Sequence, residues 1–261
     1  MKLHRRLALI AVFACAGILL NAAPLAPIHE KCRIGLSQDP GKFSLHLDDG
    51  DCTAERHCGS NYSDEFINRF TGITVADLAR EGAQLTAALT AEAGNFTCAG
   101  TVHDRVLSGD SVFTPNAAFV DRMQQLGFTG FDSEKLQAYA FVNVDSAYVR
   151  SLQQTGIHGI TIDNLIALRI FNIDPAYIDS ITALGFEKPD AGKLIALRVQ
   201  GVNAEEVRQI RALGYQPSLD EMIQIRIFHI TPDFIHRMQD RGFKNLTISK
   251  LVQIRIFNLA E

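Results

Sequence analysis

Four arginines recur at a nearly constant spacing in the C-terminal half of the chain. They are separated by 29, 28 and 29 residues, and each stands among apolar neighbours: Arg169, Arg198, Arg226 and Arg255. A row of guanidinium groups can hold an acidic peptide or another anionic ligand by forked hydrogen bonds. Each arginine can instead donate to the free carbonyls at the end of a neighbouring helix. The apolar neighbours favour this structural interpretation, and the row stops short because Ala140 stands 29 residues before Arg169.

Potential metal ligands lie in the N-terminal half. The histidines and cysteines there include His46, His57, His103, Cys52, Cys58 and Cys98. Zinc sites usually take cysteines at a tight spacing such as C-x2-C, and Cys52 and Cys58 are further apart than that. The acidic stretch Asp48-Asp49-Gly50-Asp51, with Glu55, lacks the regular spacing of a calcium loop and is typical of a solvated turn. We therefore predict no metal site and no cofactor.

Motifs of the common enzyme classes are absent from the sequence. It contains no G-x-S-x-G, no P-loop and no G-x-G-x-x-G after a strand. We therefore predict no catalytic residues and a protein that is not an enzyme. The alternative is an enzyme whose site lies in the N-terminal region around His46, His57 and His103.

The first residues predict export. Met1 to Arg6 is basic, Leu7 to Leu20 is apolar, and the small residues Asn21 to Ala23 precede Pro24, which is the layout of a signal peptide. The apolar run is short for a membrane span, which needs about 20 residues. We expect cleavage after Ala22 or Ala23, a periplasmic or extracellular location, and no membrane span in the mature chain. An uncleaved N-terminal anchor and a lipid-modified Cys15 are the alternatives.

Composition and cysteine usage agree with this expectation. The net charge of −4 argues against a nucleic-acid partner, which would need clustered Lys and Arg. Four cysteines follow the predicted signal peptide, and in an oxidising compartment they predict two disulfides with three alternative pairings. We favour Cys52 with Cys58, a short local loop, which leaves Cys32 to pair with Cys98.

Alternating and turn-flanked apolar runs predict strands before residue 115. Lys42 to Leu47 alternates polar and apolar residues. Three further runs, at 85–91, 96–102 and 106–113, are separated by short polar turns and predict an antiparallel meander. A short helix capped by Thr74 is expected at 73–78. Residues 24–114 are thus expected to form a small, disulfide-stapled, mostly-β domain after a 1–23 signal peptide.

Over half of the chain consists of one unit that recurs five times. The copies span 115–143, 144–172, 173–201, 202–229 and 230–258. Each half of a copy opens on a residue that can cap a helix, and a glycine follows the first half. The capping residues are Asn116, Asp145, Asp174, Asn203 and Thr231 for the first halves, and Asp132, Thr161, Asp190, Ser218 and Thr247 for the second halves. Each copy therefore predicts two helices of about ten residues.

Helices of this length are unstable alone and need neighbours to pack against. The sequence therefore predicts an α+β protein in which a short α-solenoid of five helical-hairpin repeats, 115–261, follows the β domain. The second helix of each unit is apolar nearly all round and is expected to be the more buried one. At the last unit, Leu251, Ile254 and Phe257 form a candidate interface for a partner or for self-association.

The units carry a resemblance to a known kind of protein. Stretches such as T-P-D-F-I-H-R-M-Q-D-R-G-F followed by L-V-Q-I-R-I-F resemble short helical repeats of exported bacterial proteins. Similar repeats follow the peptidase part of some membrane zinc metallopeptidases of the β-lactam-sensor type, and 94–115 resembles the β segment that often precedes them. The resemblance covers about 85–261, but H-E-x-x-H is absent, so the zinc chemistry does not carry over to any residue.

These observations predict an exported, non-catalytic interaction or scaffold protein that binds a protein partner through the helical repeats. The resemblance alone suggests an alternative, an accessory or sensor component of an envelope signalling or proteolysis system.

Overall fold

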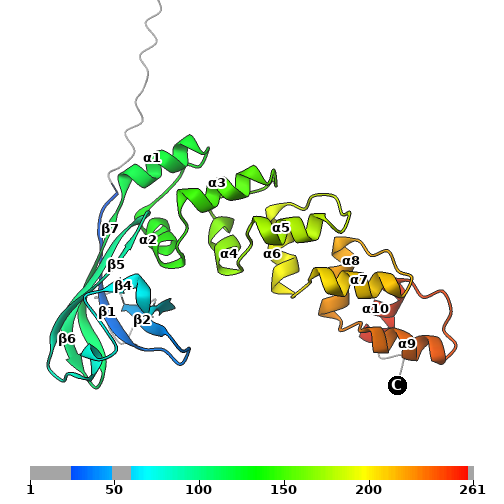
Figure 1. Cartoon of the computed structure of the whole chain (residues 1–261), viewed down its shortest axis with the longest axis horizontal. Coiled ribbons are helices and arrows are strands. Elements are labelled where there is room, and N and C mark those ends of the chain that lie inside the picture. The colour runs from blue at the N-terminus through cyan, green and yellow to red at the C-terminus, as the bar shows by residue number, and fades with distance from the viewer. Residues whose placement is uncertain (1–24, 49–59, 258–261) are drawn as a thin grey trace, which may run out of the picture.

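The computed structural model describes residues 25–48 and 60–257, so the predicted signal peptide, the acidic turn, His57, Cys52 and Cys58 lie outside the described residues. Within these residues, a seven-stranded antiparallel sheet comes first and ten helices follow. The strands are β1 (Ile28–Leu36), β2 (Lys42–Asp48), β3 (Ser60–Phe66), β4 (Phe70–Thr71), β5 (Gln84–Ala91), β6 (Gly94–His103) and β7 (Val106–Pro115). Figure 1 shows the sheet at one end of the molecule and the helices leading away from it.

The local strand predictions are confirmed, and the long-range pairing completes the sheet. β2 and the meander of β5, β6 and β7 lie where the alternation and turns predict them. The sheet order is β3-β2-β1-β7-β6-β5-β4, so β1 joins two groups of strands that are local in the sequence. The helix expected at 73–78 is only a 3-10 turn, η2 (Asp77–Ala79), whose N-cap is Ala76. The Thr74 hydroxyl still accepts from the Asp77 N–H at 3.3 Å.

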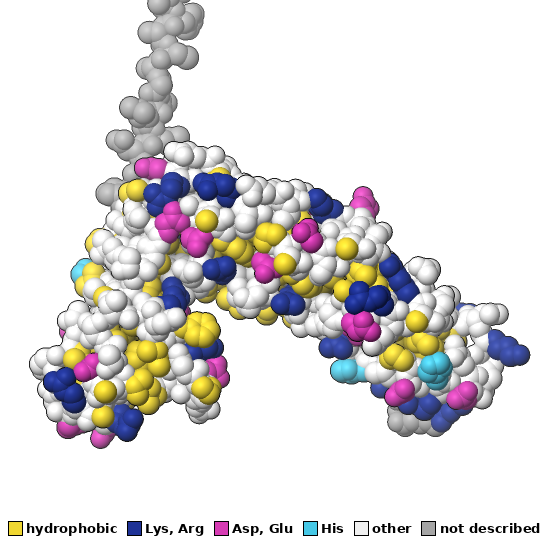
Figure 2. Space-filling model, in the orientation of Figure 1, with side chains coloured by type: hydrophobic (Ala, Val, Ile, Leu, Met, Phe, Trp, Pro, Cys, Tyr) yellow, Lys and Arg dark blue, Asp and Glu magenta, His cyan; other side chains and the backbone are white. Residues whose placement is uncertain are grey.

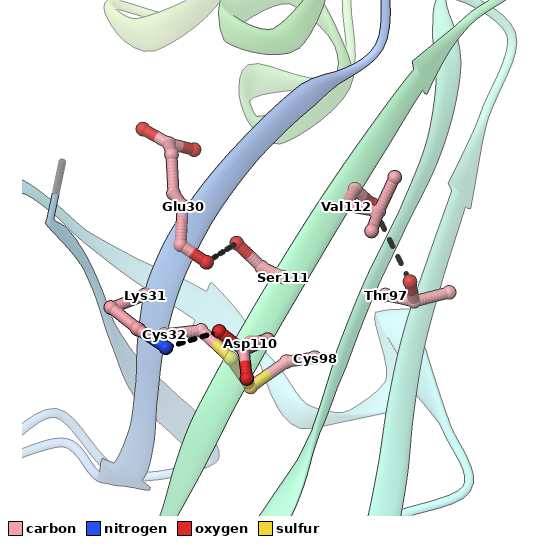
Figure 3. Close-up of a disulfide and its surroundings, with 8 residues drawn as sticks. All are labelled: Glu30, Lys31, Cys32, Thr97, Cys98, Asp110, Ser111 and Val112. Carbon is pink, nitrogen blue, oxygen red and sulfur yellow. Dashed lines mark hydrogen bonds and ion pairs between the residues drawn. A yellow bond between two sulfur atoms is a disulfide. The ribbon is translucent and has the colours of Figure 1, made fainter. Parts of the chain in front are cut away.

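The sheet curves sharply where β1, β7 and β6 meet. In a flat sheet, strands on either side of a third are about 9.5 Å apart, but the Cα atoms of Cys32 in β1 and Cys98 in β6 are 6.0 Å apart and their sulfurs are bonded. The expected Cys32–Cys98 pairing is thus present (Figure 3). Gly100 and Gly109 face each other beside it, and a Cβ on Gly109 would lie 1.9 Å from the Ala99 carbonyl oxygen. Only glycine allows β6 and β7 to approach so closely.

The helices begin and end as the sequence predicts. They are α1 (Ala117–Gln125), α2 (Ser133–Val142), α3 (Ser146–Gln154), α4 (Asn164–Ile170), α5 (Pro175–Thr182), α6 (Ala191–Val199), α7 (Ala204–Ala212), α8 (Leu219–Ile227), α9 (Pro232–Asp240) and α10 (Ile248–Ile256). Every expected capping residue except Thr161 is the N-cap of its helix, and its side chain accepts a hydrogen bond from the first turn; the N-cap of α4 is Asp163. Thr161 lies just before α4 and accepts from the Asn164 N–H at 3.2 Å.

The predicted fold class is wrong. In place of a small mostly-β domain and a short α-solenoid of five helical hairpins, the chain has one seven-stranded sheet followed by ten helices within the described residues. The closest helix contacts join α2 to α4, α4 to α6, α6 to α8 and α8 to α10, not the two helices of each predicted hairpin. α2 also packs on β5, β6 and β7, so the first helices and the sheet bury their apolar side chains together.

The helices form two rows as they leave the sheet. α1, α3 and α5 lie along one side and α2, α4 and α6 along the other (Figure 1). Within 25–48 and 60–257, no helix has both the length and the apolar character that crossing a membrane requires.

Candidate interaction surface

The four arginines of the predicted row lie at equivalent places in α4, α6, α8 and α10, and their guanidinium groups bind the protein itself. Arg198 donates from Nε to the Phe171 carbonyl at 3.0 Å, and its guanidinium lies 4.6 Å from the centre of the Tyr177 ring. The other three make similar contacts. Arg169 lies over Tyr148, Arg226 donates to the Gln200 carbonyl, and Arg255 lies over Phe234 and donates to the Phe228 carbonyl.

These contacts support the structural interpretation of the row. Nε of Arg198, Arg226 and Arg255 reaches the carbonyl that ends the preceding even-numbered helix, where no intrahelical donor remains. All three arginines are nevertheless exposed residues, and the Arg226 side chain is 45% exposed. The row can therefore contribute positive charge to a surface without being free to move.

A fifth arginine, Arg69, donates to carbonyls in the last turn of α2, as three arginines of the row donate to the ends of α4, α6 and α8. It lies in the 3-10 turn η1 (Ile67–Arg69) and donates to the Ala140 carbonyl at 2.5 Å and to the Phe141 carbonyl. It also pairs with Glu65, whose side chain is 8% exposed. Burial raises the pKa of Glu65 above its ordinary value, although the Arg69 charge opposes that shift. No local sequence pattern indicates this role of Arg69, because Arg69 lies 71 residues from Ala140.

Apolar side chains next to the arginines are exposed, although these second helices are apolar nearly all round. Ile170, Val199, Ile227 and Ile256 directly follow the four arginines and are 54%, 50%, 47% and 53% exposed. We call these four residues the apolar row. Figure 2 shows apolar side chains gathered along the lower edge of the helical part. A solid apolar run does not reveal which of its side chains face solvent.

The chain covers the corresponding position of α2 with its own sheet. Phe141, directly after Ala140, packs edge to face on Phe96 of β6 with ring centres 5.2 Å apart. In α2, the residue at this position thus packs against the sheet. In α4, α6, α8 and α10, the equivalent residue is about half exposed to solvent. The comparison indicates that the apolar row is suited to bind another surface.

The candidate interface of the last unit is only partly accessible. Leu251 and Ile254 are 0% and 7% exposed and belong to the hydrophobic core, whereas Phe257 is 68% exposed. Only Phe257 of these three can contact a partner directly, and it lies next to Ile256 of the apolar row.

The histidines and cysteines of the N-terminal half do not form a site in the described part of the chain. His46 lies on β2 and His103 at the end of β6, with β1 and β7 between these strands. His103 contacts Glu81 at 2.8 Å, and Cys98 is bonded to Cys32. No group of three His, Cys, Asp or Glu residues among those described could hold a metal ion.

Glu92, in the turn between β5 and β6, joins the sheet to the helices. Its carboxylate accepts from the Ser146 N–H at 2.6 Å, from Ser146 Oγ at 2.8 Å and from Arg122 Nε at 2.5 Å. Ser146 opens α3, where a negative charge is favoured by the helix dipole. Burial alone would raise the pKa of Glu92, but the hydrogen bonds from Ser146 and Arg122 outweigh it and lower the pKa.

We expect Glu92→Gln to lower the free energy of unfolding by about 2 kcal/mol at neutral pH, because charge-assisted hydrogen bonds are lost. The pKa of Glu92 is lower in the folded state, so its contribution is present above the unfolded pKa and is lost as the pH falls. Urea unfolding at pH 7 and at about pH 3.5 should show the difference from wild type shrinking in acid. Glu187→Gln, at an exposed position, is the control, and a difference that does not change with pH would contradict the assignment.

No family model, no curated protein and no solved structure matches this chain.

Proposed function

We propose that the chain is an exported, non-catalytic protein that binds a protein partner along α4, α6, α8 and α10. The apolar row carries the proposal, since four large apolar side chains stay exposed at equivalent positions of the alternate helices α4, α6, α8 and α10. A contiguous exposed apolar surface is typical of a protein-binding site. The neighbouring arginines add positive charge beside the row, which favours a partner with acidic groups beside its apolar ones.

The spacing of the row favours a helical segment of that partner. Packed helices lie roughly 8–10 Å apart, so successive members of the row are separated by about that distance. Residues seven apart on a helix are about 10.5 Å apart along its axis and lie on nearly the same face. An amphipathic helix of about 20 residues is therefore long enough to place one apolar side chain against each member of the row.

The disulfide supports the proposed export. Disulfides form and persist mainly in oxidising compartments outside the cytosol, and the Cys32–Cys98 bond is buried within the sheet. The basic and apolar N-terminal sequence agrees with this location.

The double variant Val199→Asp with Ile227→Asp tests the apolar row. Both side chains are about half exposed, so the melting temperature should stay close to that of wild type. Cross-linking of the tagged full chain in envelope extracts should then yield a partner that wild type captures and the double variant loses. Gln224→Asp with Gln253→Asp places the same charges at other exposed positions of α8 and α10, and it should retain the partner.

Two results would contradict the proposal. One is an identical set of cross-linked proteins for wild type and the apolar-row variant, with both folded. The other is sedimentation showing that wild type forms a dimer which Phe257→Asp dissociates, with no other protein captured. In that case the surface joins two copies of this chain.

A further inference from the structure

Hydrogen bonds join the loops that follow successive odd-numbered helices in a regular way. In each loop a glycine has positive φ, and the residue before it presents a carbonyl oxygen that the helix does not use. At three successive junctions a side chain of the next loop or helix donates to this oxygen. Gln153 donates to Leu126 at 2.8 Å, Lys188 donates to Thr155, and Arg211 donates to Leu184 at 2.7 Å.

The Arg211 junction shows how a guanidinium is held there. Nη1 donates to the Leu184 carbonyl, and the group lies 4.8 Å from the centre of the Phe186 ring. Leu184 and Phe186 flank the loop glycine, Gly185. A carbonyl acceptor and an aromatic face on the two sides of one glycine therefore make up the contact surface for the cation.

The next junction has the same surface without the arginine. Leu213 and Tyr215 flank Gly214 as Leu184 and Phe186 flank Gly185. Gln239 lies three residues before the glycine of its loop, as Arg211 does, but in the described part of the chain no side chain donates to the Leu213 carbonyl. A cavity of about 570 Å³ is present instead, lined among others by Leu213, Tyr215, Gln239, Phe243 and Glu221.

The lining of this cavity favours a planar cation. Glu221 supplies a carboxylate, whose Oε2 accepts from the Ser218 N–H and Oγ at the start of α8, so Oε1 is the oxygen offered to a cation. Tyr215 and the 40% exposed Phe243 supply aromatic rings, and no Lys, Arg or His is among the lining residues. An ammonium ion can use the charge, but a guanidinium can also stack on a ring while it donates in its own plane. The preceding junction shows this combination within the same chain.

We propose that the cavity between the α7–α8 and α9–α10 loops binds an arginine side chain of a protein partner. The guanidinium would stack on Tyr215, donate to the Leu213 carbonyl and pair with Glu221. The assignment of this arginine to a protein rests on the proposed function, whereas the guanidinium chemistry of the cavity does not.

NMR titration of the full chain with three capped tripeptides, Gly-Arg-Gly, Gly-Lys-Gly and Gly-citrulline-Gly, tests the proposal. The arginine peptide should shift the amide signals around Leu213, Tyr215 and Gln239, and should bind more tightly than the lysine peptide. Citrulline has nearly the same shape without the charge, and its peptide should give no response. Free L-arginine forms a fourth arm, and tighter binding of the free amino acid than of the peptide would overturn the assignment to a protein partner.

Two variants locate the site. Gln239→Arg supplies the missing arginine from the chain itself and should abolish the response to the peptide. Tyr215→Leu removes the stacking surface and should weaken binding roughly tenfold. No shift with the arginine peptide, an equal response to citrulline, or unchanged binding by both variants would overturn the proposal. Capture of a partner through the apolar row together with a silent arginine titration would refute the pocket alone. The reverse would refute the proposed function, and with it the protein source of the arginine, but not the binding of a guanidinium in the cavity.

Discussion

Replacing both Cys32 and Cys98 with serine is expected to lower the free energy of unfolding by about 4 kcal/mol. The two cysteines are 66 residues apart, and the bond between them restricts the unfolded chain by the entropy of a loop of that length. Both side chains are also in the core, at 1% and 0% exposure, so serine adds the cost of burying a hydroxyl. Urea unfolding, with and without the double substitution, measures the loss.

A control separates the effect of breaking the Cys32–Cys98 disulfide from the effect of replacing the two cysteine side chains. Cys52→Ser with Cys58→Ser removes the other two cysteines after the predicted signal peptide, so reduction of this background then breaks only the Cys32–Cys98 bond. Reduced and oxidised samples of that background should differ by most of the expected 4 kcal/mol. Equal urea midpoints would show that the hydrogen bonds of β1, β6 and β7 alone hold the curved sheet.

Features that depend on a few neighbouring residues could be predicted from the sequence. A capping side chain such as Asp145 or Asp174 bonds an N–H three residues away, so its pattern is visible in a short window. The β5–β7 meander is local in the same way. The pairing of β1 with β7 joins Ile28 to Phe113, and no short pattern reports such a contact.

The wrong fold class has a related cause. An apolar run such as the one in α4 shows that a helix is packed, but not against which helix. The same side chains could pack against the other helix of a hairpin, α3. In the structure, α4 instead makes its main helix contacts with α2 and α6. For the same reason the sequence does not reveal that Ile170, which follows Arg169 in that run, is 54% exposed.

The residues of the candidate site also differ in whether a local sequence pattern reveals them. The spacing of Arg169, Arg198, Arg226 and Arg255 was visible because it repeats, and its structural role could be argued from apolar neighbours. Arg69 and Glu92 could not be found, because their importance comes from contacts with helices more than 50 residues away. Sequence periodicity thus revealed the repeated surface and missed the joint between the sheet and the helices.

Arg69→Ala is expected to be the most damaging single substitution at that joint, with a loss of about 3–5 kcal/mol. It would leave Glu65 as a buried charge without its cation, and it would remove the donors to the Ala140 and Phe141 carbonyls. Arg33→Ala is the matched control, because it breaks an ion pair with Asp48 in which the arginine is 54% exposed. That control should cost at most about 1 kcal/mol in urea unfolding.

The pH dependence of the Arg69→Ala loss identifies Glu65 as its source. Without the arginine charge, the pKa of Glu65 should rise further above its ordinary value, since only burial remains as the main influence. A carboxyl group with a raised pKa favours the folded state in acid and loses that advantage as the pH rises through the folded pKa. The loss should therefore be larger at pH 7 than at about pH 5, and Glu65→Gln in the Arg69→Ala background should recover part of it at pH 7. A loss that is equal at both pH values and is not relieved by Glu65→Gln would place the whole effect on the carbonyls of α2.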